Sequence, residues 1–167
     1  MQKEQDDRSI IMAEIMTPDR VNFSGNVHGG YLMQLLDRVA YACAARYAGN
    51  YVVTLSADQI IFKQPIFVGE LVTFFATVNY VGTTSMEIGI RVEAENLLTQ
   101  VKRHTNTCYF TMVAIDQQGK PTKVKPLELR NDSERYRFAE AKMRKQMRLE
   151  FEARHEEAKK TIRQKEE

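Results

Sequence analysis

One long helical pattern followed by a run of strand patterns limits what the first 130 residues can fold into. Between Tyr31 and Tyr47, apolar residues recur at helical spacing with no glycine or proline inside, and Gly49 follows where a helix should end. We therefore predict one helix over 31–47. Its apolar character and four alanines predict that neighbouring elements surround it on most sides.

Strand patterns lie on both sides of this helix. One short apolar segment precedes it, and four segments rich in Val, Ile, Thr and aromatic residues, or alternating apolar and polar residues, follow it. The predicted strands are 9–16, 51–62, 71–81, 84–96 and 102–115. Because the connections are short, we expect antiparallel neighbours. One helix cannot cover such a sheet on both faces, so the sequence predicts an α+β protein that dimerises through its sheet.

The last part of the chain has a different composition. Residues 1–130 carry 13 basic and 13 acidic residues, whereas residues 131–167 carry 11 and 9. Asn131 and Glu134 have the spacing of a capping box. We predict two regions: a domain over 1–130 and a charged helical tail over 131–167. The tail has an apolar stripe, which is either a docking face or an oligomer contact; the stripe is Ala139, Met143, Met147 and Phe151.

Charge and hydropathy argue against several classes of partner. The net charge is +2 and the first 130 residues are neutral, so no basic face favours a nucleic-acid partner. No apolar run approaches the roughly 20 residues needed to cross a bilayer. The charged segment 1–8 lacks an apolar signal core, so we expect a cytoplasmic protein without a membrane partner.

The cysteines and histidines predict no redox or metal chemistry. Cys43 and Cys108 both lie inside apolar patterns, and we interpret them as buried, reduced thiols. The three histidines, at positions 28, 104 and 155, are scattered without the spacing of metal ligands. We expect no metal site.

Asp37 is the first candidate for chemistry. Apart from Arg38, it is the only charged residue between Tyr31 and Ala45. Arg38 is long enough to reach solvent, but the short carboxylate of Asp37 is not. On a largely buried helix this carboxylate would lose hydration and its pKa would rise, which suits a general base or nucleophile. The alternative is that Asp37 lies on a narrow exposed stripe.

The loop before the helix is the second candidate. His28, Gly29 and Gly30 stand where the helix begins, and free N–H groups at a helix N-terminus stabilise negative charge. A thioester carbonyl that becomes an oxyanion would be stabilised there, although the same triplet also occurs in ordinary turns. Asn22 and Asn26 flank the loop and can bind a carbonyl or a water; alternatively, they are Asx-turn residues.

These segments together resemble a known family. The run Asn22-Phe-Ser-Gly-Asn-Val-His-Gly-Gly30, followed by a helix with Asp37, is similar to the acyl-CoA thioesterases of the hotdog superfamily, in the group of brain-type acyl-CoA hydrolase and its bacterial relatives. The similarity continues through 62–69, 82–87 and 108–112 and covers residues 9–127. It implies a hotdog fold, in which an antiparallel sheet wraps around one long helix. The charged C-terminal helix lies outside the similarity.

The resemblance also implies an activity and site residues. Fatty acyl-CoA would be hydrolysed to free fatty acid and CoA, with Asp37 as general base or nucleophile and Asn22 of the facing subunit orienting substrate or water. The thioester oxygen would be held at His28, Gly29 and Gly30. The CoA moiety would lie near Gly82, Thr84 and Ser85. The family implies a homodimer, often a hexamer built as a trimer of dimers, and no cofactor, since coenzyme A is part of the substrate.

Three other functions share parts of this pattern. A serine hydrolase would need a G-x-S-x-G elbow, which the sequence lacks. A hotdog dehydratase acting on acyl thioesters pairs a histidine with an acidic residue, and His28 lies beside the loop, but the HFPG-like run typical of dehydratases is missing. A non-catalytic acyl-CoA-binding sensor would use the same pocket and release no thiol.

Overall fold

The computed structural model describes residues 6–166, which form two compact units that meet between Leu127 and Glu128. Residues 1–5 of the charged N-terminal segment, and Glu167 at the end of the predicted tail, lie outside the described residues. The first unit contains the sheet and its helix, and the second contains one long helix. None of the helices described is both long and apolar enough to span a bilayer.

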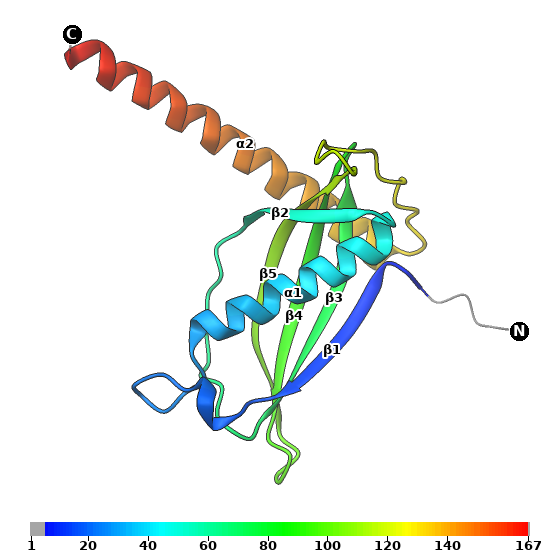
Figure 1. Cartoon of the computed structure of the whole chain (residues 1–167), viewed down its shortest axis with the longest axis vertical. Helices are drawn as coiled ribbons and strands as arrows, with labels where there is room; N and C mark the ends of the chain where they lie inside the picture. The colour runs from blue at the N-terminus through cyan, green and yellow to red at the C-terminus, as the bar shows by residue number, and fades with distance from the viewer. Residues whose placement is uncertain (1–5, 167) are drawn as a thin grey trace, which may run out of the picture. The chain divides into compact units, whose positions relative to one another are not determined.

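The first unit is a five-stranded antiparallel sheet that curls around helix α1 (Gly29–Ala48) (Figure 1). The strands are β1 (Ser9–Ile15), β2 (Tyr51–Ala57), β3 (Leu71–Val81), β4 (Ser85–Glu95) and β5 (Lys102–Ile115). Their order is β1-β3-β4-β5-β2, so β1 and β2 form the edges. Helix α1 packs against all five strands. This arrangement confirms the predicted fold class, an antiparallel sheet wrapped around one long helix.

Helix α1 begins two residues earlier than predicted, because a cap at its N-terminus stabilises the first turn. The Nδ1 atom of His28 accepts a hydrogen bond from the Gly30 N–H at 2.9 Å and so caps the first turn. Two glycines, poor helix formers, can therefore start the helix. At the other end Gly49 adopts a left-handed conformation with φ 66°, and its N–H donates to the Ala45 carbonyl at 2.9 Å. The predicted stop is confirmed.

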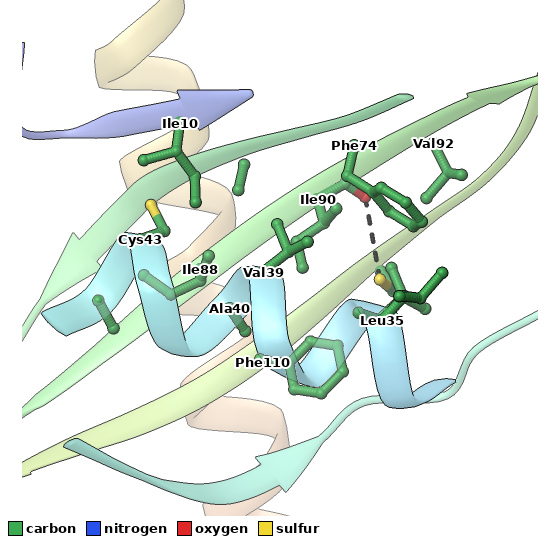
Figure 2. Close-up of a cluster of buried hydrophobic side chains, with 14 of the residues drawn as sticks. Ile10, Leu35, Val39, Ala40, Cys43, Phe74, Ile88, Ile90, Val92 and Phe110 are labelled. Atoms are coloured by element: carbon green, nitrogen blue, oxygen red, sulfur yellow. Dashed lines mark hydrogen bonds between the residues drawn. The ribbon is translucent and has the colours of Figure 1, made fainter. Parts of the chain in front are cut away.

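The core lies between α1 and the concave face of the sheet. Figure 2 shows Val39 of α1 beside Ile88 and Ile90, which both belong to β4, and Cys43 of α1 toward Ile10 of β1. The alternation predicted for β4 is confirmed, because its apolar residues are buried against the helix. Cys43 and Cys108 are free thiols within this core, as predicted, and burial raises the pKa of each to about 12.

The segment after α1 differs from the prediction in two ways. Strand β2 ends at Ala57 and not at position 62, after its register with β5 shifts between Thr54 and Ser56. It also pairs with β5 and not with β3, although β3 comes next in the sequence. The connection over 58–70 is long enough to cross the end of the sheet, so the expectation of neighbouring strands is wrong here.

The second unit contains helix α2 (Asp132–Glu166), which begins with the predicted cap. The Oδ1 atom of Asn131 accepts from the Glu134 N–H at 2.9 Å. The Glu134 carboxylate accepts in return from Asn131 Nδ2 at 3.2 Å and from the Arg130 N–H at 2.7 Å. All four members of the apolar stripe are exposed: Ala139, Met143, Met147 and Phe151. A role for this stripe in oligomer contacts stays a prediction.

Candidate active site

Asp37 lies on the face of α1 that the sheet leaves open. Its neighbours one turn away, Met33 and Tyr41, are also exposed, as is Arg38. The alternative of an exposed stripe is therefore what one chain shows for Asp37; what a second chain would cover stays a prediction. The helical pattern left both alternatives open, because periodicity alone does not show how wide the buried face is.

The carboxylate of Asp37 is held by one hydroxyl group. Thr54 Oγ1, on edge strand β2, donates to Asp37 Oδ1 at 2.6 Å and also lies 3.5 Å from Met112 Sδ. The other carboxylate oxygen, Oδ2, has no hydrogen-bond partner among residues 6–166. Sequence reasoning missed Thr54, because its approach to α1 depends on the bulge in β2 and no local pattern marks that bulge.

The N-terminus of α1 offers one backbone donor among the residues described. Within the first turn, the Gly30 N–H donates to the His28 ring, and the N–H groups of Tyr31 and Leu32 donate to the His28 carbonyl at 3.0 and 3.2 Å. The Gly29 N–H has no partner among residues 6–166. Because His28 Nδ1 accepts a hydrogen bond, the neutral ring carries its proton on Nε2. In the structure His28 therefore caps the helix, and Gly29 has a backbone N–H that is available to donate.

Asn22 belongs to a closed loop that projects beyond α1. Its Oδ1 accepts from the N–H groups of Ser24 at 2.9 Å and Asn26 at 3.2 Å, so the alternative of an Asx-type turn is what the structure shows for this oxygen. The loop is closed at its base by a bridge between Val21 and Val27. The Asn22 Nδ2 group has no hydrogen-bond partner among the residues described and can therefore donate to another molecule.

The turn between β3 and β4 lies at the end of the sheet that carries Thr54. Ser85 pairs with Val113 across β5, and Val113 pairs with Val53, the residue before Thr54. The Gly82 N–H donates to the Ser85 carbonyl at 2.8 Å, and the Thr84 carbonyl accepts from Ala114 at 2.9 Å. Within residues 6–166 no three histidine, cysteine or acidic side chains gather as metal ligands.

Comparison with known proteins identifies the family. Residues 24–100 match the thioesterase superfamily. The chain is 47% identical over 143 residues to protein VdlD of Helicobacter pylori, covering 86% of this chain and 82% of VdlD. It is 39% identical over 117 residues to an uncharacterized acyl-CoA thioester hydrolase of Zymomonas mobilis, covering 68% and 76%. The chain belongs to the acyl-CoA thioesterases.

Solved structures of other thioesterases share the fold of this thioesterase. A hexameric acyl-CoA thioesterase in its apo form matches with a TM-score of 0.83 and 33% identity, covering 87% of this chain and 93% of its own. An acyl-CoA hydrolase of Staphylococcus aureus, solved with butyryl-CoA and CoA, matches with a TM-score of 0.80 and 30% identity, covering 95% of each chain. A hexameric hotdog fold thioesterase of Campylobacter jejuni matches with a TM-score of 0.64 and 26% identity, covering 68% of this chain and 88% of its own. The predicted hotdog fold and enzyme class are confirmed.

Variants of the Staphylococcus aureus hydrolase have been solved as well. In three of them alanine replaces one aspartate, one asparagine or one threonine, and they match this thioesterase with TM-scores of 0.80, 0.81 and 0.78. The asparagine variant was solved with coenzyme A.

Proposed function

We propose that this thioesterase hydrolyses fatty acyl-CoA to free fatty acid and CoA, with Asp37 as its general base or nucleophile. The observation that carries the proposal is the 2.6 Å hydrogen bond from Thr54 to Asp37 on the open face of α1. A hydrogen bond to a charged acceptor is short and orients the carboxylate. It also leaves Oδ2 available, which is the atom that would react.

Two reaction routes use this oxygen. In the first, Oδ2 takes a proton from a water, and the resulting hydroxide attacks the thioester carbon. In the second, Oδ2 attacks the carbon itself and forms a mixed anhydride, which water then cleaves. In both routes the carbonyl oxygen becomes an oxyanion, and collapse of the tetrahedral intermediate expels CoA as a thiolate. Since thiolate is a good leaving group, the site needs no strong general acid.

The site needs a second copy of the chain. Gly29 and Asp37 are eight positions apart on one helix, which places them about 12 Å apart along its axis at the usual rise per residue. An oxyanion donor must lie about 3 Å from the oxygen it stabilises. One helix therefore cannot present both groups to one thioester. We assign the Gly29 N–H as the donor and the Asn22 amide as the group that orients substrate or water, both supplied by the facing subunit.

The surface around Asp37 supports this assembly. Strand β2 is a free edge of the sheet, and its Tyr51, Val53 and Leu55 side chains are exposed. Met33 and Tyr41 add apolar area on the open face of α1. An exposed apolar edge strand is a template for pairing with another strand, so we propose a homodimer across β2 and α1. The hexameric relatives support a trimer of such dimers.

Residue spacing supports the three side-chain roles. In the Staphylococcus aureus hydrolase, the substituted asparagine precedes the substituted aspartate by 15 positions, and the threonine follows the aspartate by 17. The same spacings separate Asn22, Asp37 and Thr54 in this chain. Residues chosen for substitution in a related hydrolase thus correspond by spacing to the three side chains assigned here.

The remaining assignments concern the CoA moiety and the cell. We place CoA near the turn that contains Gly82, Thr84 and Ser85, which lies at the Thr54 end of the sheet. Coenzyme A enters as part of the substrate, and the mechanism uses no separate cofactor. Two free, buried thiols suit a reducing compartment, and we propose the cytoplasm.

A thiol assay tests the activity. Free CoA released from acyl-CoA substrates of increasing chain length would be measured with a colorimetric thiol reagent, and we expect turnover that varies with chain length. Tight acyl-CoA binding with no thiol released would instead identify a sensor. Conversion of a 3-hydroxyacyl thioester to an enoyl thioester without thiol release would identify a dehydratase.

Mixing subunits tests the shared site. Asn22→Ala and Asp37→Asn chains, each slow alone, would be co-expressed with different affinity tags and purified through both tags. Each mixed dimer contains one intact pair of Asn22 and Asp37, so about half of its sites should regain activity. A mixed dimer as slow as its parents would show that the two residues do not act across the interface.

A further inference from the structure

An ion pair that the mechanism does not use lies beneath the loop of Asn22. The Arg103 Nη2 atom on β5 lies 2.6 Å from each carboxylate oxygen of Glu70, the residue just before β3. Glu70 is only 5% exposed. Arg103 Nη1 donates to the Pro65 carbonyl at 2.8 Å. One guanidinium therefore holds both a buried carboxylate and the backbone of the connection over 58–70.

The connection is held on two sides, by the ion pair on one and by backbone hydrogen bonds to Met16 on the other. Glu70 Oε2 accepts from the Phe67 N–H at 2.9 Å, so the carboxylate bridges Arg103 and the backbone of the connection. On the other side, Met16 pairs with the connection through two backbone hydrogen bonds, to Glu70 at 3.0 Å and from Gly69 at 2.8 Å. The segment 65–70 thus has little freedom to shift while the ion pair is intact.

The same connection supports the loop that carries the proposed donors. The Ile66 carbonyl, next to the Pro65 held by Arg103, accepts from the Val27 N–H at 2.8 Å. Val27 is the base of the Asn22 loop and directly precedes His28 and Gly29. The ring of Phe62 also lies under Gly29, 3.6 Å from where a Cβ would stand. A shift of the connection would therefore move both the Gly29 N–H and the Asn22 amide.

We propose that Arg103, paired with Glu70, is a positioning residue that sets the Asn22–Gly29 loop for catalysis at the site of the facing subunit. This inference rests on the proposed function, because it assigns Arg103 to the loop that serves the partner's carboxylate. Displacing an oriented group by about 1 Å can cost 10²-fold in rate. In this proposal Arg103 acts through the loop and not on the substrate itself.

Two substitutions of Arg103 test this role. Lysine keeps the charge but cannot hold Glu70 and Pro65 with one planar fork, so we expect Arg103→Lys to lower kcat roughly tenfold and Arg103→Gln roughly 100-fold. KM should change less than kcat, because we place the CoA moiety at the turn of Gly82, Thr84 and Ser85 and not at this loop. Arg91→Lys is the matched control: Arg91 forms an exposed 2.8 Å ion pair with Glu93 on β4, and its variant should keep wild-type kcat.

Hydrogen exchange separates positioning from general loss of structure. In Arg103→Lys, amide exchange in a peptide spanning 21–30 should become faster, while exchange in a peptide spanning β4 stays at the wild-type rate. Faster exchange in both peptides, or in neither, would contradict the proposal, because the first outcome is global destabilisation and the second leaves the loop in place.

Mixed dimers give the decisive readout. In a dimer of Arg103→Gln and Asp37→Asn chains, one site combines an intact Asp37 with an intact loop, so about half of the sites should regain activity. A dimer of Arg103→Gln and Asn22→Ala chains has a damaged loop at both sites and should stay slow. If Arg103 acted only within its own subunit's site or on stability, the first dimer would stay slow as well, and the proposal would be overturned.

The proposed function and this inference fail differently. A wild-type enzyme that releases no CoA, or a folded Asp37→Asn variant at wild-type rate, refutes the proposed function. Wild-type turnover with Asp37-dependent chemistry, together with unchanged kcat in both Arg103 variants, refutes only the role of Arg103.

Discussion

Helix α1 has one face that packs on the sheet and one face that the chain leaves open. On the packed face, Val39, Ala40 and Cys43 are at most 1% exposed. On the open face, Met33 is 48% exposed, and the one hydrogen bond to the Asp37 side chain among residues 6–166 comes from the hydroxyl of Thr54. The packed face is complete within one chain. The open face carries the candidate chemistry, and the donors that we propose for it lie at the start of α1, too far along the helix to reach Asp37 of the same chain. Stability and activity should therefore respond separately to changes on the two faces.

The largest expected effect is on the reactivity of the two buried thiols, Cys43 on the packed face of α1 and Cys108 on β5. Burial raises the pKa of Cys43 and Cys108 from 9.0 to about 12, so at pH 8 the folded protein should hold roughly 1000-fold less thiolate than the unfolded chain. We expect a maleimide to label both thiols at least that much more slowly in native than in denaturing buffer. Equal rates would mean that the packed face is open.

The same burial predicts how stability depends on pH. A thiol whose folded pKa is raised favours the protonated, folded state, so its contribution is complete below pH 9 and is lost as pH rises toward about 12. Chemical denaturation at increasing pH should show this decline, and replacing both cysteines by alanine should reduce its slope.

On the open face, Asp37→Asn should have the largest effect on rate. We expect a loss of roughly 10²-fold or more in kcat with little change in the unfolding midpoint, since the side chain is exposed. Asp116→Asn is the control, because the Asp116 side chain only accepts hydrogen bonds from Gln118 and Lys120 in a turn and asparagine can do the same. A loss of stability as large as the loss of rate would break the separation of the two faces.

Thr54→Val, on the strand that meets the same face, should lower kcat less than Asp37→Asn does. Valine preserves the shape of the side chain but removes the hydroxyl that donates to Asp37. A hydrogen bond to a charged group contributes roughly 1.5–3 kcal/mol; at this exposed position we take the lower value, which corresponds to about a tenfold loss of kcat. Thr54→Ser retains the donor and should recover most of the rate; a serine variant as slow as valine would remove the hydroxyl from the explanation.

The smallest effect is expected at the free edge. Leu55 on β2 is 66% exposed, and a lysine there should hinder pairing with a second β2 strand. Losing a single interface contact of ordinary size should raise the dimer dissociation constant roughly fivefold. Analytical ultracentrifugation of Leu55→Lys would measure this rise. Leu98→Lys, at an exposed turn between β4 and β5, should leave the dimer dissociation constant unchanged. Equal effects of the two variants would argue against a dimer across β2.

Local patterns located most of the elements. Strands β3 and β5 have the predicted boundaries, and the capping pair Asn131 and Glu134 marks the start of α2 as expected. These features depend on the period of apolar residues and on hydrogen bonds between close neighbours in the sequence. The early end of β2 at Ala57 has no such signal, because it depends on how the chain must cross the end of the sheet.

The sequence by itself determined the order of elements, the buried face of β4 and the position of a lone carboxylate on the central helix. Only the tertiary structure decided that Asp37 faces outward, that Thr54 holds it and that Arg103 meets Glu70, 33 residues away along the chain. The physical reason is range: periodicity and capping act over a few residues, whereas these contacts join segments that become neighbours only when the sheet curls around α1.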